Sequence, residues 1–174
     1  MQKLAVVYFP NINLDELNNF RQKYDPKWNV IKPHVTVVFP ISDITEELLL
    51  QHINKITRGI KSFPINLSGL TKSFDDYLFL QIQHGSDEIV SLHDKLYSGI
   101  LIPYLQKDIP FTPHITLGYF RAENNDFKKD SYEKAYLEGR GMDINLNCNF
   151  DNITLIKGDG LSPVKVIKTF NLSS

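Results

Sequence analysis

The spacing of hydrophobic and polar residues predicts short strands separated by a few amphipathic helices. A continuous apolar run at 3–9 (KLAVVYF) and a strict alternation at 142–150 (MDINLNCNF) are both typical of strands. Apolar residues at helical spacing, such as Leu17, Phe20 and Tyr24, indicate helices. We therefore expect strands at 3–9, 34–39, 63–72, 77–83, 113–120, 142–150, 153–156 and 164–172, and helices at 11–24, 45–59, 85–96 and 131–137.

The order of these elements indicates an α+β fold. It is close to β-α-β-α-β-β in the first half and α-β-α-β-β-β in the second, so strands dominate and the helices are available to cover outer faces. The 174 residues suit one substantial domain or two closely packed lobes. We expect a single bilobal domain over residues 1–174.

One short phrase occurs twice in the chain. Residues 31–40 read IKPHVTVVFP and residues 111–120 read FTPHITLGYF, and without a gap their Pro, His and Thr coincide. From His34 to His114 the copies lie 80 residues apart, close to half the chain. Random placement of the five His and eight Thr would give roughly 0.2 His-x-Thr triplets. The repeat therefore predicts a duplicated fold in which each copy serves one half.

Both copies place a polar pair on one face of an apolar strand. Residues i and i+2 of a strand share a face, roughly 6–7 Å apart. His34 and Thr36 therefore point to one side, and His114 and Thr116 do the same. Such a pair needs water, a partner or a ligand. A single copy would usually be a histidine bonded to the backbone, but two matching copies favour a functional site.

Two His-x-Thr phrases in a chain of this size resemble the signatures of the two-histidine phosphoesterase superfamily. This superfamily includes the 2′-5′ RNA ligase-like proteins and the RNA 2′,3′-cyclic phosphodiesterases. The ending NITLIKGDGLSPVKVIKTFNL is also similar to the last hairpin of that family. The resemblance implies two antiparallel sheets related by a pseudo-twofold axis, splayed into a central cleft, with helices on the outer faces and one His-x-Thr phrase from each sheet.

The resemblance also implies the chemistry. An imidazole titrates near pH ~6.5, so one histidine can accept a proton while the other donates one, as general acid–base catalysis at phosphorus requires. Thr36 and Thr116 would hydrogen-bond the phosphate oxygens. The expected reaction is metal-independent hydrolysis of a 2′,3′-cyclic phosphate, on an RNA end or a nucleotide, to a 2′-phosphate, with reverse 2′-5′ ligation by the same site. No cofactor is expected.

Strand alternation adds weaker candidates for substrate binding. Lys32 lies two residues before His34 and is placed to neutralise phosphate, while Thr112 holds the equivalent place before His114. Gly118 and Phe120 continue the face of His114, which makes Phe120 a candidate for stacking on a base. Bacterial relatives often carry an arginine within the second motif strand, whereas here Arg121 comes only at its end.

Composition narrows the surroundings in which this chemistry operates. A net charge of −1 does not favour non-specific binding of long nucleic acid. The single cysteine, Cys148, excludes an intrachain disulfide and a cysteine-based zinc site. No apolar run reaches the 18–20 residues or so of a membrane span, and the beginning MQKLAVVYFP does not resemble a signal peptide. We expect a monomeric cytoplasmic protein.

Three alternatives remain open at this stage. The cleft could belong to a nucleotide- or RNA-binding module without useful turnover. It could also act on a small non-RNA phosphodiester, such as a cyclic ADP-ribose phosphate. A zinc hydrolase would need His34 and His114 to converge with a third ligand, and no further His, Asp or Glu stands at a suitable spacing.

Overall fold

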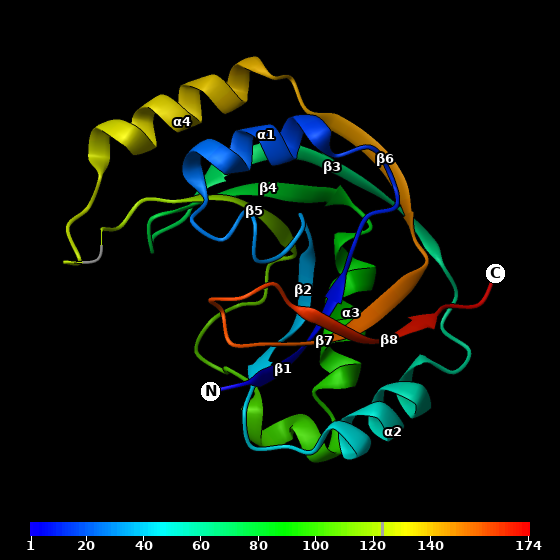
Figure 1. Ribbon diagram of the computed structural model, residues 1–174. Helices are drawn as coiled ribbons and strands as arrows, with labels where there is room; N and C mark the ends of the chain where they lie inside the picture. Colours follow the sequence, from blue (N-terminus) through cyan, green and yellow to red (C-terminus); the bar gives the residue numbers. More distant parts are fainter. Residues whose placement is uncertain (123) are drawn as a thin grey trace.

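A computed structural model describes residues 1–122 and 124–174. Its centre is one curled antiparallel sheet of eight strands in the order β6-β3-β4-β5-β2-β1-β7-β8 (Figure 1). The strands are β1 (Lys3–Tyr8), β2 (Val35–Ile41), β3 (Phe63–Lys72), β4 (Tyr77–His84), β5 (His114–Tyr119), β6 (Asn145–Phe150), β7 (Asn152–Gly158) and β8 (Lys165–Asn171). The helices are α1 (Asp15–Tyr24), α2 (Glu46–Thr57), α3 (Ser86–Leu96), the 3₁₀ helix η1 (Gly99–Tyr104) and α4 (Lys129–Gly141).

The predicted α+β class is confirmed, but the prediction of two separate sheets is wrong. The two motif strands, β2 and β5, pair with each other at Val35 and Ile115, which joins the four-stranded halves into one sheet. Pairing between distant strands depends on tertiary contacts, and the order of elements along the chain does not contain it. The four strands of one half also come from both ends of the chain. β7, near the C-terminus, pairs with β1, near the N-terminus, and β8 pairs with β7.

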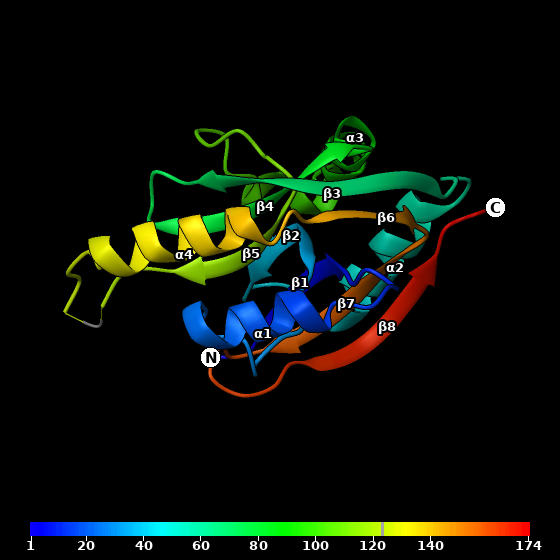
Figure 2. The same cartoon turned by 90° about the horizontal axis from the view of Figure 1, so that it is seen from above.

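Helices cover the outer surface of both halves of the sheet. α1 and α4 lie side by side over the half that contains β3, β4 and β5 (Figures 1 and 2). Glu138 of α4 links them by accepting hydrogen bonds from Lys23 and Tyr24 of α1. α2 and α3 pack against each other and contact β8 and β2 of the other half. No helix in the described ranges is both long and apolar enough to cross a membrane.

The hydrophobic core explains why the first strand is apolar throughout. In β1, Leu4, Val6 and Tyr8 belong to the large core beneath the helices. Ala5 and Val7 point to the opposite face, where they form a small buried cluster with Ile156 of β7. A strand that is buried on both faces has no polar alternation, as the run at 3–9 indicated.

A β-bulge interrupts each motif strand directly after the threonine. Val6 of β1 pairs with Val38 of β2, and the next residue, Val7, pairs with Thr36, so Val37 is the extra residue. In the same way, Leu78 of β4 pairs with Gly118 of β5 and Phe79 pairs with Thr116, so Leu117 is the extra residue. One extra residue reverses the faces of all later side chains in a strand.

This reversal corrects the expectation for Phe120 and Gly118. Phe120 is only 1 % exposed and its ring stacks on Tyr132 in the core, with 4.7 Å between the ring centroids. A Cβ atom on Gly118 would lie 2.7 Å from the Phe120 ring, so the glycine makes room for a core aromatic and not for a ligand. Tyr119 takes the cleft side instead.

Candidate functional site

A cavity of about 620 Å³ lies on the inner face of the sheet, where β2 and β5 meet. His34, Thr36 and Thr116 line it together with Tyr77 and Tyr119. Other lining residues come from β1, from α1 and the α1–β2 loop, and from β7 and the β7–β8 turn; they include Lys3, Ala5, Val7, Arg21, Asp25, Lys27, Ile31, Ile156, Gly158, Asp159, Gly160 and Val164. The cavity therefore draws on both halves of the sheet.

The strand register brings the two motifs together. Because Val35 lies opposite Ile115 in an antiparallel pair, His34 falls opposite Thr116 and Thr36 falls opposite His114. All four side chains are on the inner face, since their neighbours Val35 and Ile115 are fully buried on the other side. Each histidine thus has a threonine beside it on its own strand and another across the pair.

The same hydrogen bond orients both imidazoles. The Nδ1 of His34 lies 2.8 Å from the carbonyl oxygen of Lys32, and the Nδ1 of His114 lies 2.7 Å from that of Thr112. A carbonyl can only accept, so Nδ1 carries the proton in each ring and Nε2 is left for chemistry. The predicted binding residues Lys32 and Thr112 therefore contribute main-chain oxygens here. Their side chains are exposed and are not among those that line the cavity.

Burial disfavours the protonated form of both histidines, because it lowers the pKa of each imidazole. Withdrawal from bulk water at the bottom of the cleft lowers the pKa of His34 to about 4. The Lys32 carbonyl opposes this shift, the Arg21 guanidinium and His114 add to it, and the Asp25 carboxylate partly offsets it. Burial also lowers the pKa of His114, while the Thr112 carbonyl and the Asp75 carboxylate raise it.

An aromatic row forms one wall of the site. The rings of Tyr119 and Tyr77 are paired across β5 and β4 with centroids 4.5 Å apart, and Phe79 lies 5.8 Å beyond Tyr77. Phe79 in turn stacks on the imidazole of His114 at 3.6 Å. This contact fixes the ring and shields it from water. The wall was not predicted from the sequence, although Tyr77 and Phe79 at i and i+2 in an apolar strand were a signal for it.

A buried ion pair beneath the α1–β2 loop was also missed. Arg21 and Asp25, one helical turn apart, are 1 % and 5 % exposed, and their closest atoms are 2.7 Å apart. The signal was an arginine at i+4 from Leu17, on the apolar side of α1. Arg121, the other arginine in question, pairs with Asp76 and reaches Asn125. Its guanidinium is therefore engaged outside the cavity lining.

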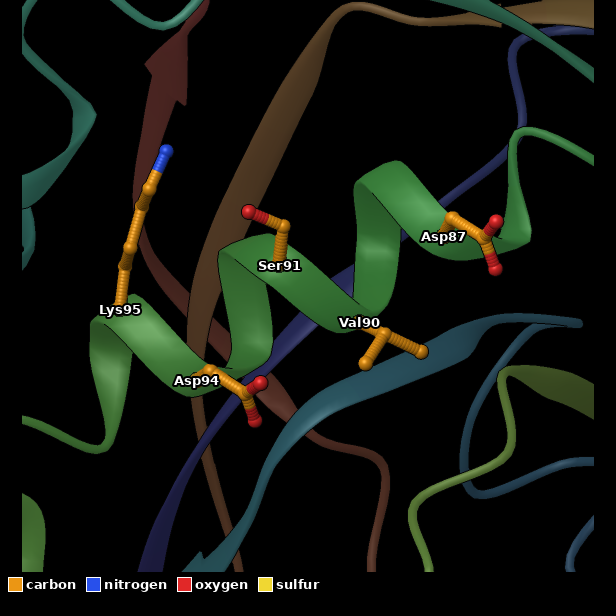
Figure 3. A pocket seen from close by; sticks show the side chains of 5 residues that line it. All are labelled: Asp87, Val90, Ser91, Asp94 and Lys95. Atoms are coloured by element: carbon orange, nitrogen blue, oxygen red, sulfur yellow. The ribbon is translucent and has the colours of Figure 1, made fainter.

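A second depression lies on the outer surface of α3 and offers no comparable arrangement. Asp87, Val90, Ser91, Asp94 and Lys95 all project from that one helix (Figure 3). No histidine is among them, and no residue of a motif strand takes part. Within the described residues, no group of three His, Cys, Asp or Glu side chains is arranged to hold a metal ion. The cavity over the inner face of β2 and β5 remains the candidate site.

Fold and site together define a two-histidine phosphoesterase type of protein. Residues 9–161 match the sequence profile of the 2′-5′ RNA ligase superfamily, and the chain belongs to this family. The resemblance proposed from the repeated phrase is thereby confirmed at the level of the family.

Curated relatives in bacteria support the same class. A protein of Bacillus licheniformis named "Putative phosphoesterase" is 25 % identical over 120 residues, which cover 66 % of this chain and 69 % of the relative. A Geobacillus kaustophilus protein with the same kind of name is 23 % identical over 159 residues, covering 88 % of this chain and 87 % of the relative.

Solved structures share the fold. The apo crystal structure of E. coli LigT aligns with a TM-score of 0.64 at 16 % identity, covering 99 % of this chain and 98 % of that one. A Thermus thermophilus protein aligns with a TM-score of 0.64 at 17 % identity, covering 98 % and 97 %. LigT has also been crystallised with 3′-AMP; that structure aligns with a TM-score of 0.61 at 17 % identity, covering 99 % of both chains.

Proposed function

We propose that this protein hydrolyses 2′,3′-cyclic phosphates, on RNA ends or nucleotides, to 2′-phosphates by acid–base catalysis between His34 and His114. The observation that carries the proposal is the register of β2 and β5, which sets two His-Thr pairs side by side on the inner face of the sheet. His34, Thr36 and Thr116 line the cavity there, and His114 lies opposite Thr36 beside it. In this arrangement a phosphate above the paired strands would have one imidazole on each side, as in-line displacement at phosphorus requires.

The environments of the two histidines support distinct roles. His34 is deeply desolvated and lies near Arg21, so it holds a proton poorly and is suited to accept one from the attacking water. His114 lies near the Asp75 carboxylate, which favours its protonated form. The negative charge of a bound phosphate raises the pKa of both rings. His114 is then the better proton donor to the departing 3′ oxygen.

Each step of the reaction has a group to perform it. Water loses a proton to Nε2 of His34 as its oxygen bonds to phosphorus, and the bond from phosphorus to the 3′ oxygen breaks. His114 gives its Nε2 proton to that oxygen, and the phosphate stays on the 2′ oxygen. The hydroxyls of Thr36 and Thr116 are placed to donate hydrogen bonds to the non-bridging oxygens, where negative charge grows. With a 5′-hydroxyl in place of water as the nucleophile, the same displacement would join a cyclic end to a second chain through a 2′-5′ linkage, and the 3′ oxygen would leave as before.

The aromatic wall supports a nucleotide over an inorganic or purely acidic substrate. Tyr77 and Tyr119 present paired rings beside Thr116, and a base that stacks on such a surface gains about 1–3 kcal/mol. LigT has been crystallised with 3′-AMP, ATP and NADP⁺. A small non-RNA cyclic phosphodiester that carries a base remains a compatible substrate.

The test is release of 2′-phosphate from the four nucleoside 2′,3′-cyclic phosphates, a cyclic-ended oligonucleotide and a cyclic ADP-ribose phosphate, with EDTA present. His34→Ala and His114→Ala should each lower kcat by about 10²–10⁴-fold. The matched control is His84→Ala, because His84 is exposed at the end of β4 and outside the cavity lining. Circular dichroism checks that each variant folds.

Three outcomes would contradict the proposal. Activity that EDTA abolishes would indicate a metal-dependent hydrolase. Full activity in both alanine variants would remove the histidines from the chemistry. Tight nucleotide binding without turnover would favour the second candidate, a nucleotide- or RNA-binding module, for which the aromatic wall is the specific observation.

A further inference from the structure

The cavity has a side arm that the proposed reaction does not use. It continues from Thr36 along β1 and β7, over a floor formed by the buried residues Ala5, Val7 and Ile156. Ile31 and Val164 pack against the same floor from the two loops above it. Lys3 lies at the outer end of this arm, on the same face of β1 as Ala5 and Val7, and Lys27 lies in the loop above.

The two loops that cover the arm are tied to each other. The backbone N–H of Val164, after the β7–β8 turn, donates to the carbonyl oxygen of Val30 in the α1–β2 loop at 3.0 Å. The Nζ of Lys27 lies 3.9 Å from the place where a Cβ on Gly160 would stand. The lysine amine therefore lies close to the glycine turn at the side of the cavity.

The buried ion pair holds the lysine-bearing loop from below. The carboxylate of Asp25 accepts hydrogen bonds from Arg21 and, at 2.9 Å, from the backbone N–H of Lys27. The Nη2 of Arg21 also donates to the carbonyl oxygen of Ile31 at 3.0 Å. Its Nη1, although buried, has no hydrogen-bond partner within residues 1–122 and 124–174. A guanidinium that lines the cavity thus keeps one unused donor.

The arm carries an excess of positive charge. In the part of the chain that the structure describes, neither Lys3 nor Lys27 forms an ion pair. Arg21 is balanced by Asp25. Asp159, the other carboxylate of the lining, already accepts from the backbone N–H groups of Leu161 and Ser162 and from Gln2. Two lysines therefore face one acid that is otherwise engaged.

We propose that this arm, with Lys3 and Lys27 at its rim, binds a second phosphate group of the substrate. This inference rests on the proposed function, because it places the second phosphate relative to the one held between His34 and His114. The preferred substrate is then a 2′,3′-cyclic phosphate whose ribose also carries a phosphate at its 5′ oxygen. That group is either a terminal phosphomonoester or the phosphodiester to the preceding nucleotide of an RNA.

The dimensions of the arm agree with this assignment. Val7 pairs with Thr36, and strand β1 rises roughly 3.3 Å per residue, so the Cα atom of Lys3 lies about 13 Å along the strand from that of Val7. A lysine side chain reaching back toward the motif leaves room for one sugar unit between its amine and Thr36. The apolar floor offers that sugar a surface without charged groups.

The experiment compares three substrates at one ionic strength: adenosine 2′,3′-cyclic phosphate, its 5′-phosphorylated form, and the dinucleotide ApA with a 2′,3′-cyclic end and a free 5′-hydroxyl. We expect kcat/KM to be at least about tenfold higher for the two substrates with a second phosphate. The larger of these two values distinguishes a phosphomonoester from an RNA phosphodiester as the group bound.

Variants locate the preference in the arm. In Lys27→Met, Lys3→Met and the double variant, the ratio of kcat/KM with and without the 5′ phosphate should fall, reaching about one in the double variant. Lys55→Met is the matched control, because Lys55 is an exposed lysine of α2 outside the cavity lining, and it should keep the wild-type ratio.

Failure of this inference can be told apart from failure of the proposed function. If the wild type hydrolyses all three substrates equally, the second site is overturned while the hydrolase stands. The same conclusion follows if the lysine variants keep the wild-type preference for the dinucleotide, because that preference would then come from its second base and not from its phosphate. If none is hydrolysed, calorimetric titration with adenosine 2′-phosphate and adenosine 2′,5′-bisphosphate decides: tighter binding of the bisphosphate that is lost in the lysine variants supports the site, and equal binding overturns it.

Discussion

The side chains of His34 and His114 are oriented by the same local backbone structure but have different neighbours. Residues 31–39 and 111–119 have the same order of exposed, half-buried and buried positions, and both strands bulge directly after the threonine. In both, a carbonyl two residues earlier accepts from Nδ1. The neighbours differ: His34 lies near the Arg21–Asp25 pair and opens toward the lysines, while His114 is stacked on Phe79 and lies near Asp75.

The comparison shows how a repeated backbone can carry unequal chemistry. The phrase determines where Nε2 points, but elements outside the repeat determine how readily it takes a proton. General acid–base catalysis needs this inequality, since two identical imidazoles would compete for the same role. If the two histidines differ as their neighbours indicate, substitutions at or beside each of them should have different effects.

The largest expected difference lies between the two histidine variants on substrates with different leaving groups. A phosphodiester with a p-nitrophenolate leaving group needs no proton from an acid. His114→Ala should therefore recover most of its loss of about 10²–10⁴-fold on that substrate, whereas His34→Ala should not. Initial rates with bis(p-nitrophenyl) phosphate and with a 2′,3′-cyclic nucleotide give the comparison. Recovery in His34→Ala instead would exchange the two roles.

The threonines should contribute about equally, because the register places them equivalently. Thr36→Val and Thr116→Val keep the shape of the side chain and remove the hydroxyl. Each should lower kcat by about 10²-fold if the hydroxyl stabilises charge in the transition state. Thr45→Val, which removes the cap of α2 away from the cleft, is a control that should affect stability and leave kcat unchanged. A change in KM alone would assign the threonines to ground-state binding.

After the bulge in β5, Phe120 lies in the core and Tyr119 lines the cavity, so substitution of Phe120 should affect mainly stability and substitution of Tyr119 mainly substrate binding. Phe120→Ala should lower the free energy of unfolding by about 3–5 kcal/mol, because it empties a core site. Tyr119→Ala should cost less stability and raise the KM for a nucleotide about tenfold through lost stacking. Denaturant unfolding and steady-state kinetics measure both. Should Phe120→Ala not fold, Phe120→Leu gives the same comparison with a smaller loss in the free energy of unfolding. A KM effect of Phe120→Leu with unchanged stability would contradict the placement of that ring.

The smallest predicted effect is on pH dependence. The free enzyme is active when His34 is unprotonated and His114 is protonated, so kcat/KM should rise with pH through the pKa of His34, about 4, and fall as pH exceeds that of His114. Because burial lowers the pKa of His114 below its ordinary value of about 6.5, the optimum should be on the acidic side of that value.

Asp75 offers a way to sharpen this profile. Its carboxylate raises the pKa of His114, so Asp75→Asn should move the alkaline limb of kcat/KM to lower pH by a few tenths of a unit and leave the acidic limb in place. Asp87→Asn on α3 keeps the same change of charge outside the cavity lining and should move neither limb. A shift of the acidic limb by Asp75→Asn would mean that His34, and not His114, senses this carboxylate.

The sequence alone determined what depends on local order. Apolar runs and alternating stretches indicated all eight strands, and the strand period placed His34 with Thr36 and His114 with Thr116 on shared faces. Repetition of the phrase pointed to the family, which the profile match over residues 9–161 confirms. Element boundaries were less well predicted. The helix expected at 131–137 extends over Lys129–Gly141, with Met142 as its C-cap, so the strand expected at 142–150 begins only at Asn145.

Tertiary structure decided everything that depends on distant residues meeting. The pairing of Val35 with Ile115 joined two expected sheets into one, and the bulge at Leu117 sent Phe120 into the core and Tyr119 into the cleft. Burial of Arg21 and the arrival of Lys27 beside Gly160 were likewise absent from any local pattern. Side-chain direction along a strand follows a period of two that one extra residue reverses, and only the partner strand shows where that residue lies.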